Sequence, residues 1–136
     1  MILGLGLDLV ELERIAEIDQ RHGQAFERRI ARPGEVRPRR GAARVQHLGG
    51  LFAAKEAVLK ALGTGWAQGL SLRQVEVRHR PDGGPEIELH GAASERAQKL
   101  GVETIHVTIT HERTHAAAVA VLEGPGVSVD EETKSP

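Results

Sequence analysis

The sequence predicts an α+β fold in which a mainly antiparallel sheet, built from an N-terminal strand and two hairpins, packs against one long central helix. Apolar residues alternate with other residues in several short segments, which is the periodicity of a strand. Residues 81–84 read Pro-Asp-Gly-Gly, a turn-forming sequence, and they separate two such segments. Residues 46–62 instead repeat apolar side chains at helical spacing.

The chain is expected to begin with a strand and then a helix. In residues 2–7, Leu3, Leu5 and Leu7 alternate with Gly4 and Gly6, which predicts a strand that ends at Asp8. Residues 10–22 place apolar side chains at helical spacing, and Gly23 provides a stop. Residues 31–44 contain two prolines and two glycines without any periodicity, so we expect a basic connector there.

The long helix over 46–62 should end at Gly63. Beyond it we expect, in order, a hairpin of residues 70–80 and 85–90, a short helix over 92–100, and a second hairpin from 105 to 122 with its turn at 112–114. These elements form one domain over residues 1–123. Residues 124–136 are poor in apolar side chains and acidic, so we expect a disordered tail.

Composition limits the chemistry that the chain can perform. It has no cysteine, which excludes thiolate metal sites and a cysteine nucleophile, so any metal must have oxygen or nitrogen ligands. Aromatic residues make up only 2%, so the core must be aliphatic. The first ten residues lack a basic stretch and include Asp8, unlike a signal peptide or a membrane span. We therefore expect a soluble, cytoplasmic protein without a membrane partner.

The net charge of −1 conceals a basic segment. Between Arg21 and Lys55 the chain has nine lysines and arginines and two acidic residues, a local charge of +7. Such a segment attracts nucleic acid, a membrane surface or an acidic protein, or is simply a solvated loop. A nucleic-acid-binding module is one hypothesis, but Phe26 is the only aromatic residue in 21–44 for base stacking. That hypothesis also leaves the acidic residues described next without a role.

Two carboxylates are candidates for binding a cation. Asp8 follows a strand whose alternate residues are glycine, where a backbone or a ligand can approach closely, although an aspartate at a strand end is often a cap or turn residue. Glu56 and Lys60 lie one turn apart on the long helix and are either a surface ion pair or part of a site. The turn Gly63-Thr64-Gly65 after this helix favours a site, because its backbone can approach phosphate oxygens.

A row of polar residues follows the strand over 105–110. Thr104, His106, Thr108 and Thr110 share one face of that strand, and His111 ends it. A face lined by hydroxyl groups that ends in a histidine suits a polar ligand, and a solvent-facing sheet surface explains the same alternation.

Three segments together resemble the signature blocks of the holo-acyl-carrier-protein synthase family of phosphopantetheinyl transferases. These are GLGLDLVELERI at 4–15, FAAKEAVLKALGTG at 52–65 and HVTITHERTHAAAVAV at 106–121. Their order is that of the family, and the resemblance extends from Met1 to about Leu122.

The resemblance implies transfer of 4′-phosphopantetheine from coenzyme A to a serine of an apo acyl carrier protein, releasing adenosine 3′,5′-bisphosphate. It implies a homotrimer with active sites between subunits. The implied roles of individual residues are Mg²⁺ binding by Asp8 and Glu56, catalysis by Glu56, Lys60 and His111, coenzyme A binding by Lys60, Gly63, Thr64, Gly65, Thr108 and His111, and carrier binding by Arg14 and Arg21. Glu56, a metal-bound water and His111 remain alternatives for the group that accepts the serine proton.

The chain departs from the family pattern at two positions. Leu51 stands where many relatives carry arginine, and Thr108 replaces a common serine. A relative that binds coenzyme A or a carrier without catalysis is therefore a further alternative.

Overall fold

The structure is a computed structural model that describes residues 1–63 and 69–126. In chain order its elements are β1 (Ile2–Glu11), α1 (Leu12–His22), α2 (Gln24–Ile30), α3 (Gly41–Leu62), the 3₁₀ helix η2 (Leu72–Gln74), β2 (Val75–His79), β3 (Pro85–Leu89), α4 (Gly91–Leu100), β4 (Thr104–His111) and β5 (His115–Glu123). None of the helices within these described ranges has both the length and the apolar composition needed to span a bilayer.

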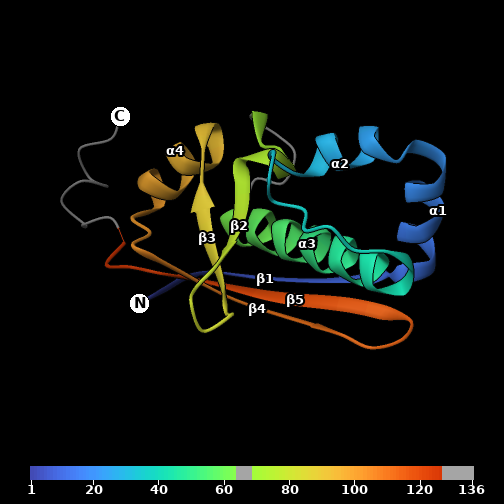
Figure 1. Cartoon of the computed structure of the whole chain (residues 1–136). Coiled ribbons are helices and arrows are strands. Elements are labelled where there is room, and N and C mark those ends of the chain that lie inside the picture. The colour runs from blue at the N-terminus through green and yellow to red at the C-terminus, as the bar shows by residue number, and fades with distance from the viewer. Residues whose placement is uncertain (64–68, 127–136) are drawn as a thin grey trace.

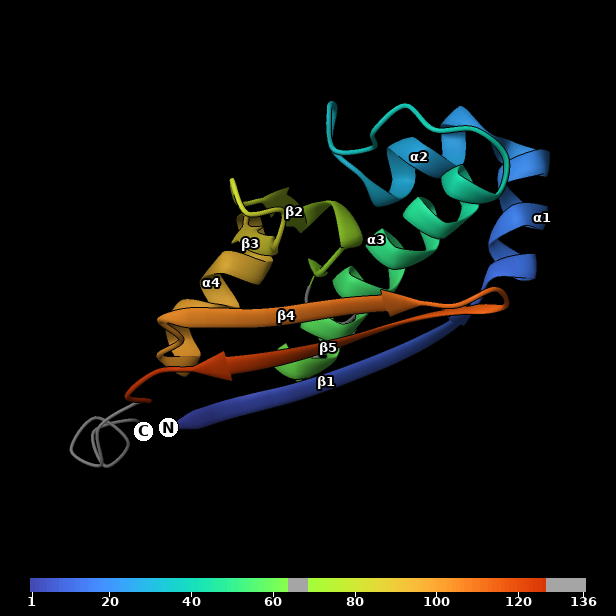
Figure 2. The same cartoon turned by 60° about the horizontal axis from the view of Figure 1, so that its bottom comes forward.

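The strands form two antiparallel sheets, which confirms the predicted α+β class. One sheet has the order β1-β5-β4, and the hairpin β2-β3 is the other. Figure 1 shows α3 lying along one face of the three-stranded sheet, with α1 and α2 at one end of the molecule and α4 at the other. In the view of Figure 2 the three strands lie side by side in front of α3. The residues of α3 that face the sheet and the inward residues of β5 form the centre of an aliphatic core.

The glycines of β1 allow α3 to pack unusually close to the sheet. A β-carbon on Gly6 would collide with the carbonyl oxygen of Ala57, and one on Gly4 would collide with that of Ala61. The predicted close approach of backbone at these glycines is therefore confirmed, and the approaching backbone is that of α3. Asp8, two residues further along β1, lies on the same inward side.

The leucines of β1 consequently face away from the core. Leu5, Leu7 and Leu9 are about two-thirds exposed, at 66%, 63% and 66%. Their cross-strand partners on β5 are Val121, Val119 and Ala117. We call these six residues the outer sheet face. These six residues are apolar, whereas the same side of β4 carries Thr108 and its neighbouring polar residues.

Several predicted boundaries were wrong. β1 continues past Asp8 to Glu11 because its backbone stays paired with β5 as far as His115, so α1 begins at Leu12 rather than at residue 10. α3 begins at Gly41, five residues before the predicted start, which leaves residues 31–40 as the connector. The helix α2 was not predicted. The strand predicted over 70–80 is shorter because 72–74 form a 3₁₀ turn.

The end of the described chain is joined to its beginning. The Gly124 N–H donates to the Met1 carbonyl oxygen at 3.1 Å, and the Met1 amino group donates to the Gly124 carbonyl oxygen at 2.9 Å. The predicted disordered tail over 124–136 falls mostly on residues 127–136, which lie outside the described residues.

Candidate functional site

Asp8, Glu56 and Lys60 form a polar cluster where β1 meets α3. The Lys60 ammonium lies 2.9 Å from Asp8 Oδ1 and also donates to the Leu7 carbonyl oxygen at 3.2 Å. Glu56 lies one turn earlier on the same helix, and its carboxylate is close enough for the charge of Asp8 to act on it. The structure therefore brings together the two predicted metal ligands and the predicted catalytic lysine.

The electrostatics of this cluster favour a bound cation. Burial, and next the negative charge of Asp8, raise the pKa of Glu56, while Lys60 opposes this effect. The hydrogen bond to Asp8 raises the pKa of Lys60. Asp8 Oδ2 is buried without a hydrogen-bond partner among the described residues. An unsatisfied carboxylate oxygen beside a second carboxylate fits a hard divalent cation such as Mg²⁺, which one or two carboxylates commonly hold.

A second group of side chains has metal-ligand spacing. One ligand atom from each of Glu76, Glu88 and His90 lies within 4.8 Å of the others on the outer side of the β2-β3 hairpin. However, the Arg78 guanidinium contacts Glu76 at 3.0 Å and Glu88 at 2.6 Å and so already supplies the positive charge. The cluster at Asp8 has the unsatisfied oxygen, so we favour it as the metal site.

Only part of the predicted glycine turn is described. Gly63 is the C-cap of α3 with a φ of 86°, a left-handed conformation that glycine adopts readily. It follows Lys60 by less than one turn, so the end of α3 carries the lysine and begins the turn. Thr64 and Gly65 lie outside the described residues, and their predicted coenzyme A contacts stay predictions.

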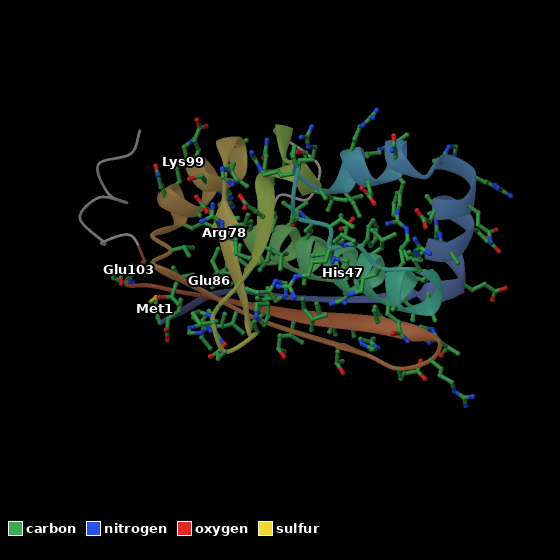
Figure 3. All side chains as sticks on the ribbon, viewed as in Figure 1. Met1, His47, Arg78, Glu86, Lys99 and Glu103 are labelled. Atoms are coloured by element: carbon green, nitrogen blue, oxygen red, sulfur yellow. The ribbon has the colours of Figure 1, made fainter. Side chains whose placement is uncertain are left out.

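A pocket of about 380 Å³ lies on the other flank of α3, where the connector, the hairpin and the end of β4 meet. We call it the β4 pocket. Its polar lining includes Arg39 from the connector, His47 from α3, His79 from β2 and His111 from β4, and Leu51 forms part of its apolar wall. Figure 3 shows His47 on α3. The predicted residue His111 is therefore part of a basic pocket, but on the opposite flank of α3 from Asp8.

The β4 pocket carries excess positive charge. Burial, and then the charges of Arg39 and Arg37, lower the pKa of His47. Burial and Arg37 also lower the pKa of His79. The Arg37 N–H donates to His47 Nε2 at 3.0 Å, which leaves Nδ1 as the donor of the neutral ring. Arg37 and Arg39 pair with no acidic side chain among the described residues, so the positive charge that disfavours protonation of the two histidines is suited to binding an anion.

Thr108, Arg14 and Arg21, the remaining predicted site residues, lie in neither the cluster at Asp8 nor the β4 pocket. Thr108 points from β4 toward the outer sheet face, where its cross-strand partner is Val119. Arg14 and Arg21 are exposed on α1. A single chain therefore does not bring Thr108 or His111 to the cluster at Asp8.

The basic segment between Arg21 and Lys55 has less free positive charge than its sequence indicates. Arg44 bonds with Asp19 and Glu27 at 2.9 Å and 2.8 Å, and Lys55 is completely buried. Sequence reasoning also missed Arg39, His47 and His79 as site residues. They come from three separate segments, and no motif connects them.

The raised pKa of Glu56 predicts a specific effect on stability. The folded state binds a proton at Glu56 more tightly than the unfolded state does, so stability is lost as pH rises from the unfolded pKa through the higher folded pKa. We expect Glu56→Gln to raise the melting temperature at pH 7.5 in a chelator, with a smaller gain near pH 4. The exposed Glu11→Gln is the control and should show no such gain. A wild type more stable than Glu56→Gln at pH 7.5 would contradict the assignment.

Comparison with known proteins identifies the family. The model of the 4′-phosphopantetheinyl transferase superfamily matches residues 4–120. A holo-[acyl-carrier-protein] synthase of Nitratidesulfovibrio vulgaris strain DP4 is 47% identical over 123 residues, which cover 90% of this chain and 99% of that relative.

Solved structures agree with this match. A holo-[acyl-carrier-protein] synthase from Neisseria meningitidis is similar with a TM-score of 0.80 and 34% identity, covering 90% of this chain and 99% of its own. A holo-(acyl-carrier-protein) synthase from Bacillus anthracis, solved in complex with CoA (3′,5′-ADP), has a TM-score of 0.76 and 31% sequence identity. The match covers 91% of this chain and 98% of that one. Because the family model and these relatives match most of the chain, the chain belongs to the 4′-phosphopantetheinyl transferase superfamily.

Proposed function

We propose that this chain transfers 4′-phosphopantetheine from coenzyme A to a serine of an apo acyl carrier protein in the cytoplasm, in the presence of Mg²⁺. The observation that carries the proposal is the cluster of Asp8, Glu56 and Lys60, in which a buried carboxylate oxygen has no partner among the described residues. The similarity to holo-[acyl-carrier-protein] synthases over 90% of the chain supports the same reaction.

In this reaction the serine oxygen attacks the β-phosphorus of the donor. A new phosphorus–oxygen bond forms, the bond to the adenosine-bearing phosphate breaks, and adenosine 3′,5′-bisphosphate leaves with the electron pair. Asp8 and Glu56 would hold Mg²⁺, which when bound neutralises charge on the pyrophosphate. Lys60 is half exposed and one turn from Glu56, so its ammonium is available to a donor phosphate oxygen.

Of the candidates for accepting the serine proton, Glu56 is supported by its position and by its raised pKa. A water held beside Asp8 and Glu56 is a second candidate. His111 lies in the β4 pocket, so the His111 of the same chain does not reach this cluster. A neighbouring copy of the chain would have to supply His111 for it to act there.

The separation of the two places supports an active site between subunits. The cluster at Asp8 carries the two predicted metal ligands, the β4 pocket carries the arginine and histidines that would bind an anion, and α3 separates the two places within one chain. We propose that the pocket of one copy receives the phosphate-bearing nucleotide end of coenzyme A while the cluster of the next copy holds the pyrophosphate. The outer sheet face would bury its exposed leucines in the homotrimer that results.

Charge on α1 supports docking of the carrier. Arg14 and Arg21 are exposed there, and a carrier protein with an acidic surface would be attracted to them. We expect Arg14→Glu to raise the KM for the carrier about tenfold, to leave the KM for coenzyme A nearly unchanged, and to flatten the salt dependence of carrier use. The physical reason is screening, because the Debye length falls from about 10 Å at 0.1 M salt to about 3 Å at 1 M.

The measurement is kcat/KM for each substrate across a salt series. Lys99→Glu makes the same change of charge on exposed α4, which lies at the other end of the molecule from α1 (Figures 1 and 3), and it should have little effect. Equal salt slopes for the two substrates in the wild type would rule out steering by α1.

Incubation with Mg²⁺, coenzyme A and a panel of apo carrier proteins, read by intact mass, tests the proposed function. A mass gain of one phosphopantetheine group on a carrier serine supports the enzyme. Binding of coenzyme A or a carrier without a mass gain would identify an inactive relative. Salt-sensitive binding of RNA or DNA without either would identify a nucleic-acid-binding module.

The structure gives a reason to favour the active enzyme over these alternatives. Leu51 is 3% exposed in the wall of the β4 pocket and contributes no charge. Arg39 supplies positive charge at the same pocket, and His47 and His79 add imidazole groups that can bond to an anion from two other positions. The loss of a single arginine therefore does not leave the pocket without anion-binding groups.

A further inference from the structure

A buried ion pair outside the proposed chemistry joins four segments of the chain. The Lys55 ammonium lies 2.7 Å from Glu35 Oε2, and both side chains are almost fully buried, at 0% and 2% exposure. Lys55 also donates to the carbonyl oxygens of Leu72, at 3.2 Å, and Val75. All three hydrogens of the ammonium group therefore have acceptors.

The Glu35 carboxylate is bonded equally well. Its Oε1 accepts the Arg32 N–H at 3.0 Å, and its Oε2 accepts the Val77 N–H at 3.0 Å. Through this pair the connector, α3, η2 and β2 are held against one another. The Arg32 guanidinium adds a bond to the Arg73 carbonyl oxygen at 2.8 Å, which attaches the connector to η2 a second time.

Stability alone is a weak explanation for such a pair. The free energy needed to remove two charges from water cancels much of their electrostatic attraction. Well-packed apolar residues therefore often replace a buried ion pair without loss of stability. Unlike apolar residues, the pair fixes the position of the joined segments relative to one another, because its hydrogen bonds are directional.

The joined segments are those that form the basic lining of the β4 pocket. The connector supplies Arg39, α3 supplies His47, and β2 ends at His79. The connector also bonds to α3 directly, through the Arg37 N–H and His47 Nε2. A shift of the connector or of β2 relative to α3 would therefore separate Arg39, His47 and His79 from one another.

We propose that Glu35 and Lys55 are positioning residues, which hold the connector and β2 against α3 so that Arg39 and the imidazoles of His47 and His79 converge on one anionic group of the donor. The inference rests on the proposed function, in which this pocket receives the nucleotide end of coenzyme A. Both side chains are buried and neither lines the β4 pocket, so neither would contact a donor bound there.

The test compares Glu35→Gln, Lys55→Met and the double variant. Each single variant leaves a buried charge without its partner, so we expect the melting temperature to fall by about 10 °C. The double variant leaves no unpaired charge and should recover most of that loss. The probe is adenosine 3′,5′-bisphosphate, whose Kd is measured by calorimetry and needs no catalysis.

We expect the double variant to bind this probe about tenfold more weakly than the wild type although its stability has recovered. With coenzyme A as substrate, its KM should rise by a similar factor while kcat changes little. Glu88→Gln is the matched control, since it removes an exposed ion pair with Arg78 on the outer side of the same hairpin. It should alter neither the Kd nor the KM.

The inference fails if the affinity of the double variant returns to the wild-type value together with its stability, because a purely structural role predicts that result. It also fails if a double variant with recovered stability changes kcat and leaves the KM and the Kd as in the wild type. The proposed function fails separately, if the wild type itself neither transfers the group nor binds the probe.

Discussion

Glu56→Gln and Asp8→Asn are each expected to reduce transfer about a thousandfold or more, because each removes a carboxylate that would hold Mg²⁺ at the pyrophosphate. Asp8→Ala should do the same. The buried Asp8 oxygen has no partner among the residues that the structure describes, and a bound cation would offset both this cost and the one that raises the pKa of Glu56. The measurement is the mass gain of the carrier across a Mg²⁺ series.

The same experiment needs a control for the fold. Glu11→Gln removes a carboxylate from the exposed end of β1 and should keep wild-type activity and Mg²⁺ dependence. In a chelator, none of the three site variants should melt more than a few degrees below the wild type. Wild-type activity of any of these variants at low Mg²⁺, with an intact fold, would show that Asp8 and Glu56 do not hold the metal.

Leu7→Glu is expected to abolish both assembly and transfer. Leu7 lies in the centre of the outer sheet face with 63% of its surface exposed, and its cross-strand partner is Val119. A carboxylate on this face would have to be buried in an interface between copies, which is costly without a partner. Sedimentation should show a trimer for the wild type and a monomer for the variant.

The control for Leu7→Glu is Gln98→Glu, which adds the same charge to an exposed position on α4. It should remain a trimer with full activity. Transfer per chain should also fall when the wild type is diluted until the trimer dissociates. A Leu7→Glu variant that is folded, monomeric and fully active would contradict the site between subunits.

Mixing two inactive variants gives a sharper measure of the shared site. If one copy supplies Glu56 and the next supplies His111, trimers assembled from Glu56→Gln and His111→Ala chains contain some sites with both wild-type residues. Random mixing in equal amounts should restore about a quarter of the wild-type activity, since each site draws on two copies of a symmetric ring. No recovery after refolding the mixture would show that each site is built within one chain, provided that each variant alone is inactive.

The sequence alone determined the elements that depend on local pattern. The alternation in 2–7 predicted a strand, Gly63 correctly predicted the end of α3, and Pro-Asp-Gly-Gly at 81–84 correctly predicted the hairpin turn. The resemblance of three segments also predicted Asp8, Glu56 and Lys60, which the fold brings together. These features could be predicted because turn chemistry, helix stops and short motifs depend on residues close together in the chain.

Only the tertiary structure decided which face of β1 is inside. Alternation distinguishes two faces without saying which is buried, and here the glycines lie inside because the carbonyl groups of α3 leave no room for a β-carbon, so the leucines lie outside. The β4 pocket and the Glu35–Lys55 pair likewise depend on long-range packing. Their residues come from segments far apart in the chain, and no local periodicity records which of those segments will meet.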